Sequence, residues 1–147
     1  MLETDRNATD VWAKRKQQAM ALLGGTMLKM PVRFWDANML FKGVENAWWR
    51  LKTGGFPATN HSSGSHPLFV LAKIGNQGFR ICPCSSKGGS SRYIRKGCAL
   101  MQTNEVVDRN SYLVERFSCT LPASAAFSAQ PRLSGIVPDA CIRGERP

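Results

Sequence analysis

The segment from His66 to Lys87, HPLFVLAKIGNQGFRICPCSSK, constrains the fold of this chain more than any other. It holds two apolar runs, Leu68 to Ala72 and Phe79 to Cys84, separated by Gly-Asn-Gln-Gly at 75–78. Asn and Gly tolerate the positive φ angle of a tight turn, so this pattern predicts a β-hairpin. The first run lacks the polar alternation of a half-exposed strand, and we therefore expect a central strand covered on both faces.

Polar residues gather at the two far ends of this predicted hairpin. His66 begins the first strand, and Ser85, Ser86 and Lys87 leave the second. Because the strands of a hairpin run antiparallel, these ends come together. The hairpin therefore predicts a candidate site in which His66 lies near the two serines and the lysine. The alternative for His66 is a structural role, as a strand-start residue hydrogen-bonded to loop backbone.

Length and composition indicate a single domain over residues 1–147. The chain is 43% hydrophobic and 20% charged, which is typical of globular rather than disordered proteins. No apolar run approaches the roughly 20 residues that a membrane span requires. The first ten residues, MLETDRNATD, carry acids and no apolar stretch, so they do not resemble a secretory signal. We therefore expect a cytoplasmic protein without membrane association.

The cysteines predict no metal site, and no cofactor is indicated. They stand at 82, 84, 98, 119 and 141, an odd number, and Cys82-x-Cys84 is not the C-x-x-C spacing of zinc ligands. We expect buried free thiols, because Cys commonly behaves as a small hydrophobe. On a strand, Cys82 and Cys84 share one face and Ile81 occupies the other.

Positive charge is concentrated in the middle of the chain. The net charge is +10, and no Asp or Glu occurs between Asn46 and Asn104. Such a single-sign region attracts polyanions, so it favours RNA, or DNA, as a partner. An acidic protein partner and a basic surface kept for solubility are the alternatives. The candidate nucleic-acid contacts are Arg50, Lys52, Lys73, Arg80, Ser86, Lys87, Arg95 and Lys96.

Two segments before the hairpin have readable patterns. Residues 10–23 predict an amphipathic helix that ends at a pair of glycines. Val44 to Lys52, VENAWWRLK, alternates in the manner of a strand, so Trp48 and Trp49 should face opposite ways. One of the two is then a core residue. The other either packs against a loop or is a surface aromatic that stacks a base.

The segments after the hairpin predict further strands. Ser111 to Leu121 is the longest alternating run and predicts one continuous strand, and residues 132–137 predict an edge strand. Short strands near Gly97 bring the total to five or six, with long loops between them. The chain therefore predicts a mainly β fold, a small, strongly bent antiparallel β-barrel over residues 44–137, preceded by an N-terminal α-helix.

Three pieces of the chain follow one another in an order that suggests a family. They are ENAWWRLK, then NHSSGSHPLFVLAK with a basic residue before Pro, then ICPCSSKGG with hydroxyl residues after a Pro-containing strand end. This order resembles MazF/PemK-type toxins, small SH3-like barrels that cut RNA, over about Val44 to Leu121. The resemblance implies an SH3-like barrel, a homodimer, cleavage of RNA without a metal, and an acidic antitoxin-like protein as partner.

Carried over onto this sequence, the family's basic residue falls at His66 and its hydroxyl residue at Ser85. Family members use Arg and mostly Thr at these positions. In this reaction the ribose 2′-OH attacks the adjacent phosphate, which requires a proton acceptor, a proton donor and a cation. An Arg stays charged, whereas a His exchanges protons near neutral pH. His66 would therefore take a different role, with Arg92 or Arg95 supplying charge, and the expected catalytic residues are His66, Ser85 and Arg92.

We therefore expect an RNA-binding barrel protein that is a candidate metal-independent endoribonuclease. One alternative is a non-catalytic barrel that binds nucleic acid or a protein through the same basic surface. Another is a toxin-like barrel that has lost its function. His66 in place of Arg is the feature that keeps both alternatives open.

Overall fold

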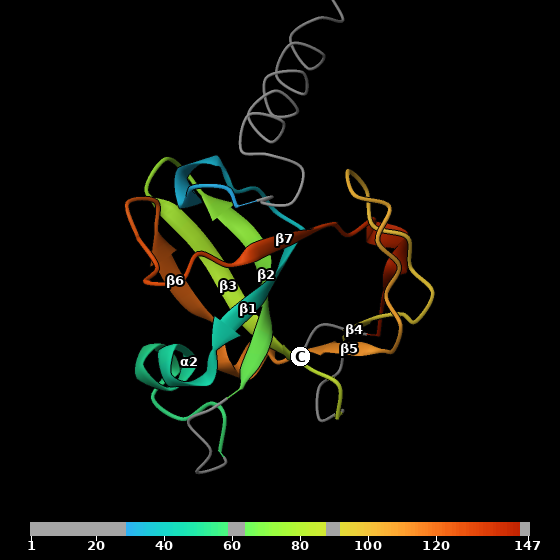
Figure 1. Ribbon diagram of the computed structural model, residues 1–147, viewed down its shortest axis with the longest axis horizontal. Coiled ribbons are helices and arrows are strands. Elements are labelled where there is room, and N and C mark those ends of the chain that lie inside the picture. The colour runs from blue at the N-terminus through green and yellow to red at the C-terminus, as the bar shows by residue number, and fades with distance from the viewer. Residues whose placement is uncertain (1–28, 59–63, 88–91, 145–147) are drawn as a thin grey trace, which may run out of the picture.

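A computed structural model describes residues 29–58, 64–87 and 92–144 of the chain (Figure 1). This part is mainly β. Its strands are β1 (Met39–Glu45), β2 (Ser65–Ile74), β3 (Gly78–Ser85), β4 (Tyr93–Ile94), β5 (Ser111–Leu113), β6 (Cys119–Pro122), β7 (Arg132–Ile136) and β8 (Ile142–Arg143). The helices are α2 (Asn46–Thr53) and the 3₁₀ helices η1 (Val32–Phe34), η2 (Glu115–Phe117) and η3 (Asp139–Cys141). The helix predicted over 10–23 lies outside the described residues.

The strands form one antiparallel sheet that divides at β3. Their order is β7-β1-β2-β3-β5-β4-β8, and β6 also pairs with β3. Residues 78–81 of β3 pair with β6, whereas residues 84–85 pair with β5. β1, β2, β3, β6 and β7 make a curled half-barrel, here called the barrel. β4, β5, β8 and the loops at 95–110 and 137–141 make a smaller unit beside it, here called the lobe (Figure 1). The predicted mainly β, strongly bent antiparallel sheet is confirmed, although it begins at Met39 rather than Val44.

β2 and β3 form the hairpin that the sequence predicts. They pair antiparallel, with Leu68 opposite Pro83, and the chain turns at residues 75–77. β2 lies between β1 and β3 in the sheet. Leu68 and Val70 are buried on one face and Phe69 on the other. The prediction of a central strand covered on both faces is therefore confirmed.

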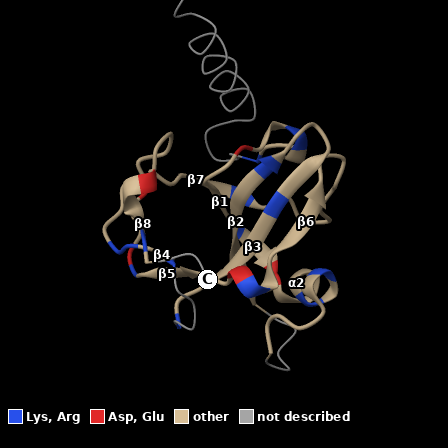
Figure 2. Cartoon of the chain, turned by 180° about the vertical axis from the view of Figure 1, so that it is seen from behind, with Lys and Arg blue, Asp and Glu red and all other residues tan. Residues whose placement is uncertain are grey.

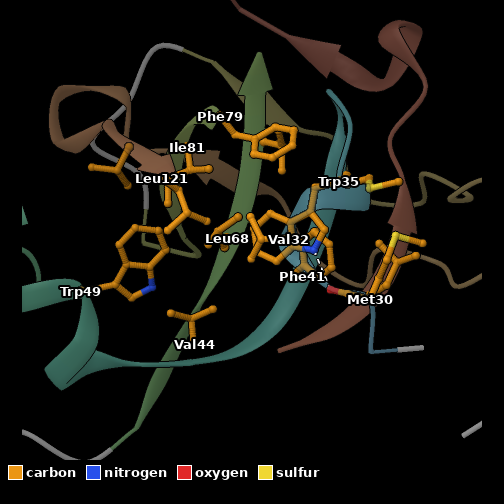
Figure 3. Close-up of a cluster of buried hydrophobic side chains, with 14 of the residues drawn as sticks. Met30, Val32, Trp35, Phe41, Val44, Trp49, Leu68, Phe79, Ile81 and Leu121 are labelled. Atoms are coloured by element: carbon orange, nitrogen blue, oxygen red, sulfur yellow. Dashed lines mark hydrogen bonds between the residues drawn. The ribbon is translucent and has the colours of Figure 1, made fainter. Parts of the chain in front are cut away.

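Each face of the sheet carries a hydrophobic core. The main core, inside the barrel, holds the largest buried side chains, among them Trp35, Trp49, Phe41 and Phe79 (Figure 3). Trp35 stacks on Phe41 with ring centroids 4.0 Å apart, and its indole N–H donates to the Met30 carbonyl. The second core lies between the sheet and the lobe. Its buried members are Leu40, Phe69, Cys82, Cys84, Ile94, Cys98, Leu100, Leu113, Val137 and Cys141.

The segment from Val44 to Lys52 is not a strand, as its alternation suggests, but the end of β1 followed by α2. Helical spacing turns Asn46 and Trp49, three residues apart, toward the core and leaves Leu51 87% exposed. Gly54 then ends the helix in the left-handed conformation, with φ +78°. The Gly pair after the segment was the local signal for a helix end.

The two tryptophans of α2 divide into a core residue and a partly exposed one. Trp49 is fully buried in the main core. Trp48 meets Trp49 edge-on, with ring centroids 5.0 Å apart, and lies 4.9 Å from the ring of Phe127 in the loop before β7. Trp48 therefore packs against a loop, which is the first of its two predicted roles.

The run from Ser111 to Leu121 is not one strand either. β5 ends at Leu113, η2 turns the chain, and β6 begins at Cys119. Leu113 belongs to the second core and Leu121 to the main core, on opposite faces of the sheet. The break is required because β5 and β6 pair with different parts of β3. The edge strand predicted over 132–137 is β7, at one end of the strand order.

Two of the five cysteines form a disulfide, so the prediction of free thiols is wrong for them. Cys98 and Cys141, 43 residues apart, are joined within the second core. Cys82, Cys84 and Cys119 are free, and the first two share a face of β3 as expected. Disulfides persist mainly in oxidising compartments, so this bond counts against the cytoplasmic expectation.

Candidate functional site

A cleft of about 700 Å³ opens between the barrel and the lobe. The barrel lines it with Leu40, Lys42, Asn46, Phe56, Pro57, Ser65, His66 and Pro67. The end of β3 and the residues after it add Cys84, Ser85, Ser86 and Lys87, and the lobe adds Leu100 and residues 105–111. The four polar residues at the far ends of the hairpin therefore line one cleft.

Antiparallel pairing brings the start of β2 and the end of β3 to the same end of the hairpin. The paired register ends at Leu68 of β2 and Pro83 of β3, and His66 and Ser85, each two residues beyond this pair, both line the cleft. At that point β3 takes β5 as its partner, with Ser85 opposite Tyr112. The cleft thus opens where β3 leaves the barrel for the lobe.

Three neighbours hold His66 in place. Asn46 Oδ1 lies 2.6 Å from Nδ1 of the imidazole, so Nδ1 carries a proton and donates to the amide oxygen. Phe56 meets the ring edge-on with centroids 4.9 Å apart, and the Trp49 indole N–H donates to the His66 carbonyl at 3.1 Å. In the neutral ring the other nitrogen, Nε2, is then the proton acceptor, and it has no hydrogen-bond partner among the described residues.

Electrostatics favour the neutral form of His66. Burial lowers the pKa of its imidazole below the ordinary value of 6.5, and the positive charge of Lys87 lowers it further. At neutral pH the ring is therefore uncharged and can accept a proton. A cation in the manner of the family's Arg does not fit these surroundings.

Asn46 is a site residue that the sequence pattern missed. It is the first residue of α2, only 6% exposed, and its backbone N–H donates to the Gly64 carbonyl just before β2 at 3.0 Å. The strand predicted over Val44 to Lys52 gave no indication that Asn46 begins a helix and contacts His66. A helix prediction ending at Gly54 would have placed Asn46 at a helix start, where a polar side chain is common.

The residues after β3 form the polar mouth of the cleft. The Lys87 backbone N–H donates to Ser85 Oγ at 3.2 Å, so the Ser85 hydroxyl proton remains available to a ligand. Ser86 and Lys87 are exposed, and Lys87 forms no ion pair with any residue that the structure describes. Lys87 is thus a cation free to meet an anionic group.

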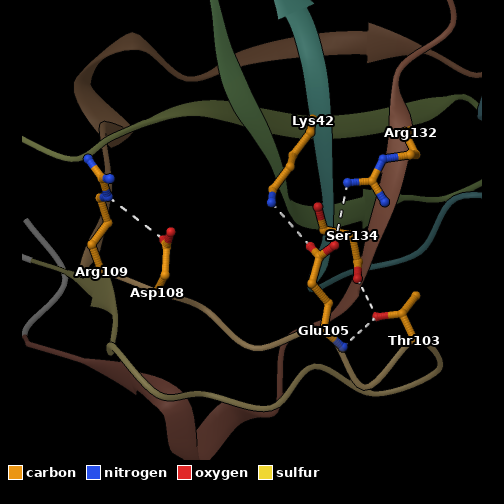
Figure 4. Close-up of polar contacts among 7 residues, drawn as sticks. All are labelled: Lys42, Thr103, Glu105, Asp108, Arg109, Arg132 and Ser134. Atoms are coloured by element: carbon orange, nitrogen blue, oxygen red, sulfur yellow. Dashed lines mark hydrogen bonds and ion pairs between the residues drawn. The ribbon is translucent and has the colours of Figure 1, made fainter.

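On the lobe side, Glu105 ties the cleft wall to the barrel. Its carboxylate lies 3.3 Å from Lys42 Nζ of β1 and 3.4 Å from Arg132 Nη2 of β7 (Figure 4). Burial would raise the pKa of Glu105, but the Ser134 hydroxyl beside it and the cations Lys42 and Arg132 lower it instead. Glu105 is therefore ionised at neutral pH, and Lys42 and Arg132 balance its negative charge.

The thiol of Cys84 lines the cleft but is not a nucleophile. Burial raises its pKa to about 12, so almost no thiolate exists at neutral pH. The chemistry of the cleft must therefore come from His66 and the residues after β3.

Arg92 stands apart from the other two expected catalytic residues. Its guanidinium donates two hydrogen bonds to the Glu115 carboxylate, at 2.9 and 2.7 Å. It does not line the cleft, whereas His66 and Ser85 do. The cation beside His66 is Lys87, whose charge acts on the imidazole.

The other predicted nucleic-acid contacts do not gather in the cleft. Figure 2 shows Lys and Arg residues spread over both the barrel and the lobe. Of the predicted set, Ser86 and Lys87 line the cleft. The rest lie elsewhere: Arg50 and Lys52 on α2, Lys73 in β2, Arg80 in β3, and Arg95 and Lys96 after β4.

Within the described ranges, no three or more His, Cys, Asp or Glu side chains are arranged to hold a metal ion. That part of the chain also contains no helix long and apolar enough to cross a membrane.

Comparison of the chain with protein-family models, with curated proteins and with solved structures found no match. The MazF/PemK-like resemblance therefore rests on the three sequence pieces, and the activity that it implies stays a prediction.

Proposed function

We propose that this protein binds single-stranded RNA in the cleft and cleaves it without a metal ion. The observation that carries the proposal is the contact between Asn46 Oδ1 and His66 Nδ1, which leaves Nε2 as the proton acceptor of a neutral imidazole in a residue that lines the cleft. A positioned acceptor of this kind suits removal of the ribose 2′-OH proton. Lys87 supplies positive charge beside it.

The proposed reaction is a transesterification. Nε2 of His66 takes the proton of the 2′-OH, whose oxygen attacks the adjacent phosphorus. The bond from phosphorus to the 5′-oxygen breaks, and that oxygen takes a proton from solvent or from the Ser85 hydroxyl, which solvent then reprotonates. His66 releases the proton it took to solvent before the next cycle. The products are a 2′,3′-cyclic phosphate and a 5′-OH end, and Lys87 offsets the charge that develops on the phosphorane oxygens. DNA lacks the 2′-OH, so it would bind without being cut.

Two substitutions of His66 test this proposal by RNA cleavage in EDTA. His66→Ala removes the proton acceptor and should lower the rate about 10²–10⁴-fold while RNA binding remains. His66→Arg restores a cation but cannot exchange a proton near pH 7. Loss of activity in both variants, with unchanged thermal unfolding, supports proton transfer by His66. Full activity of His66→Arg would instead assign it the family's cationic role.

A non-catalytic nucleic-acid-binding barrel is the second candidate. It is favoured because two of the cleft cations already have an acidic partner and are less available to offset charge on a reacting phosphate. Lys42 contacts Glu105, and Arg109 lies 3.7 Å from Asp108. Lys87 is then the one cleft cation without an ion pair among the described residues. If the unchanged protein cuts no RNA but binds it over the wider basic surface, through about six phosphate contacts, the affinity should fall roughly 10³-fold between about 50 and 200 mM salt, and this second function replaces the first.

The homodimer and the acidic antitoxin-like partner belong to the same proposal. A net charge of +10 suits an acidic partner. Capture of such a protein that weakens as salt is raised, without RNA binding, would favour a protein-binding barrel.

A further inference from the structure

The cleft is larger than a phosphate group requires. Its volume of about 700 Å³ lies within the range of about 300–1,000 Å³ that is typical of sites for whole small molecules. His66, Ser85 and Lys87 occupy one corner of it. Part of the remaining lining is apolar, so it suits a part of the ligand other than a phosphate group.

The bottom of the cleft is apolar. Leu40 and Leu100 line it, yet each is at most 4% exposed and belongs to the second core. Val107 packs against the same core, and Val106 at the rim is 58% exposed. The cleft therefore exposes the margin of the second core, where a charged group would lose its water without gaining a partner.

Asn110, three residues after Val107, adds an amide to the lining of the cleft. Its oxygen accepts the Lys96 backbone N–H at 2.8 Å, which fixes the side chain. Its Nδ2 donates no hydrogen bond to the described residues, so two N–H groups remain for a ligand. Apolar walls with a few placed polar groups suit a flat ligand with a polar edge, which is the chemistry of a nucleobase.

We propose that the cleft holds one complete nucleotide of single-stranded RNA, with its phosphate beside Lys87 and its base against the apolar lining of Leu40, Leu100, Val106 and Val107. This subsite rests on the proposed function, since it assigns the RNA a base pocket next to the reacting phosphate. A base inside a duplex is stacked and paired and cannot enter, whereas an unstacked base of a single strand can.

The test compares nucleoside 5′-monophosphates with ribose 5-phosphate as ligands of the whole chain, by titration calorimetry. Burial of a base against apolar side chains strengthens binding, so at least one of AMP, GMP, CMP and UMP should bind about 10-fold tighter than ribose 5-phosphate. Equal binding of all five ligands would overturn the base pocket.

Two variants separate the base from the phosphate. Val106→Gln and Val107→Gln should remove most of the nucleotide's advantage and leave ribose 5-phosphate binding unchanged, whereas Lys87→Ala should weaken both ligands by a similar factor. Val106 is exposed, so its variant tests the pocket even if the Val107 variant fails to fold. Leu51→Gln is the matched control, because Leu51 is an exposed apolar residue outside the cleft.

RNA assays on the same variants distinguish the two proposals. A protein that cuts RNA but binds nucleotides and ribose 5-phosphate equally keeps the proposed function and loses the base pocket. A protein that prefers nucleotides but cuts no RNA keeps the pocket and loses the catalysis. An unchanged nucleotide preference in both valine variants would mean that the base binds elsewhere, and the pocket would then be wrong.

Discussion

Asn46 Oδ1 lies 2.6 Å from His66 Nδ1, and this contact joins the start of α2 to the start of β2. It fixes two properties at once: the orientation of the imidazole and the nitrogen that carries its proton. A buried amide beside a His suits proton transfer, because a neutral ring held in one tautomer always presents the same acceptor. The departure from the family's Arg at position 66 is thus accompanied by a partner suited to a His.

Replacing Asn46 should change the pH dependence of the reaction as well as its rate. Asn46→Ala frees the ring and should lower cleavage about 10-fold or more, because the acceptor is no longer positioned. Asn46→Asp keeps the contact but adds a negative charge, which stabilises the protonated imidazole and raises its pKa. The acid limb of kcat/KM against pH should therefore move to higher pH. A limb that stays in place would give Asn46 only a structural role.

Lys87 should affect the same acid limb of the pH profile, because its positive charge lowers the pKa of His66. His66 acts as a base only when deprotonated, so kcat/KM should rise with pH through a pKa below 6.5 and level off near neutral pH. Lys87→Ala removes the second cause of the lowered pKa, so the limb should move up toward 6.5 while binding of RNA weakens. A limb that moves down would contradict the electrostatic coupling of these two residues.

The hairpin could be predicted because its signals are local. The Gly-Asn-Gln-Gly turn and the apolar runs beside it need no knowledge of the rest of the chain, and antiparallel pairing then brings the strand ends that carry His66 and Ser85 to one cleft. α2 was missed because Ala47, Trp49 and Leu51 imitate a strand. Only the structure reveals that Leu51 points to solvent.

Contacts between distant segments could not be predicted from single residues. Apolar and polar residues alternate from Ser111 to Leu121, yet the segment contributes side chains to both cores, because one part of β3 pairs with β5 and another with β6. The partner of Arg92, Glu115, and the partners of Glu105 likewise depend on how the lobe meets the barrel. The sequence places eight Lys and Arg residues between Asn46 and Asn104, whereas the fold pairs Arg92 with Glu115 and distributes the cations over both the barrel and the lobe.

Glu105 should stabilise the fold in a pH-dependent way. The pKa of its carboxyl is lower in the folded chain than the ordinary value of 4.5, so its contribution is complete above that value and is lost as pH falls through the folded pKa. Glu105→Gln should therefore unfold more easily at pH 7, by roughly 0.2–1 kcal/mol for partly exposed pairs, and match the unchanged protein once the pH lies below the folded pKa.

The control for Glu105 is Asp108→Asn. Asp108 and Arg109 form a solvent-exposed ion pair with their charged atoms 3.7 Å apart, so this change should leave the thermal midpoint nearly unaltered at every pH. A pH-independent loss in Glu105→Gln would point to packing instead of charge.

The Cys98–Cys141 disulfide should contribute strongly to stability, because it closes a loop of 43 residues. Chain-entropy estimates give about 4 kcal/mol for a loop of this length. The double variant Cys98→Ala/Cys141→Ala should lose about this amount in the free energy of unfolding, measured by denaturant titration. Cys119→Ala is the matched control, since Cys119 is free and only partly buried.

A dithiol reductant separates the covalent bond from the packing of the two side chains. It should destabilise the unchanged protein by a similar amount and leave the double variant unaffected, because that variant has no bond to reduce. If the reductant has no effect on the unchanged protein, the two thiols are not joined in solution, and the objection to a cytoplasmic location disappears. If it has the expected effect, the lobe wall that faces His66 depends on an oxidised bond, and RNA cleavage should be assayed under oxidising conditions.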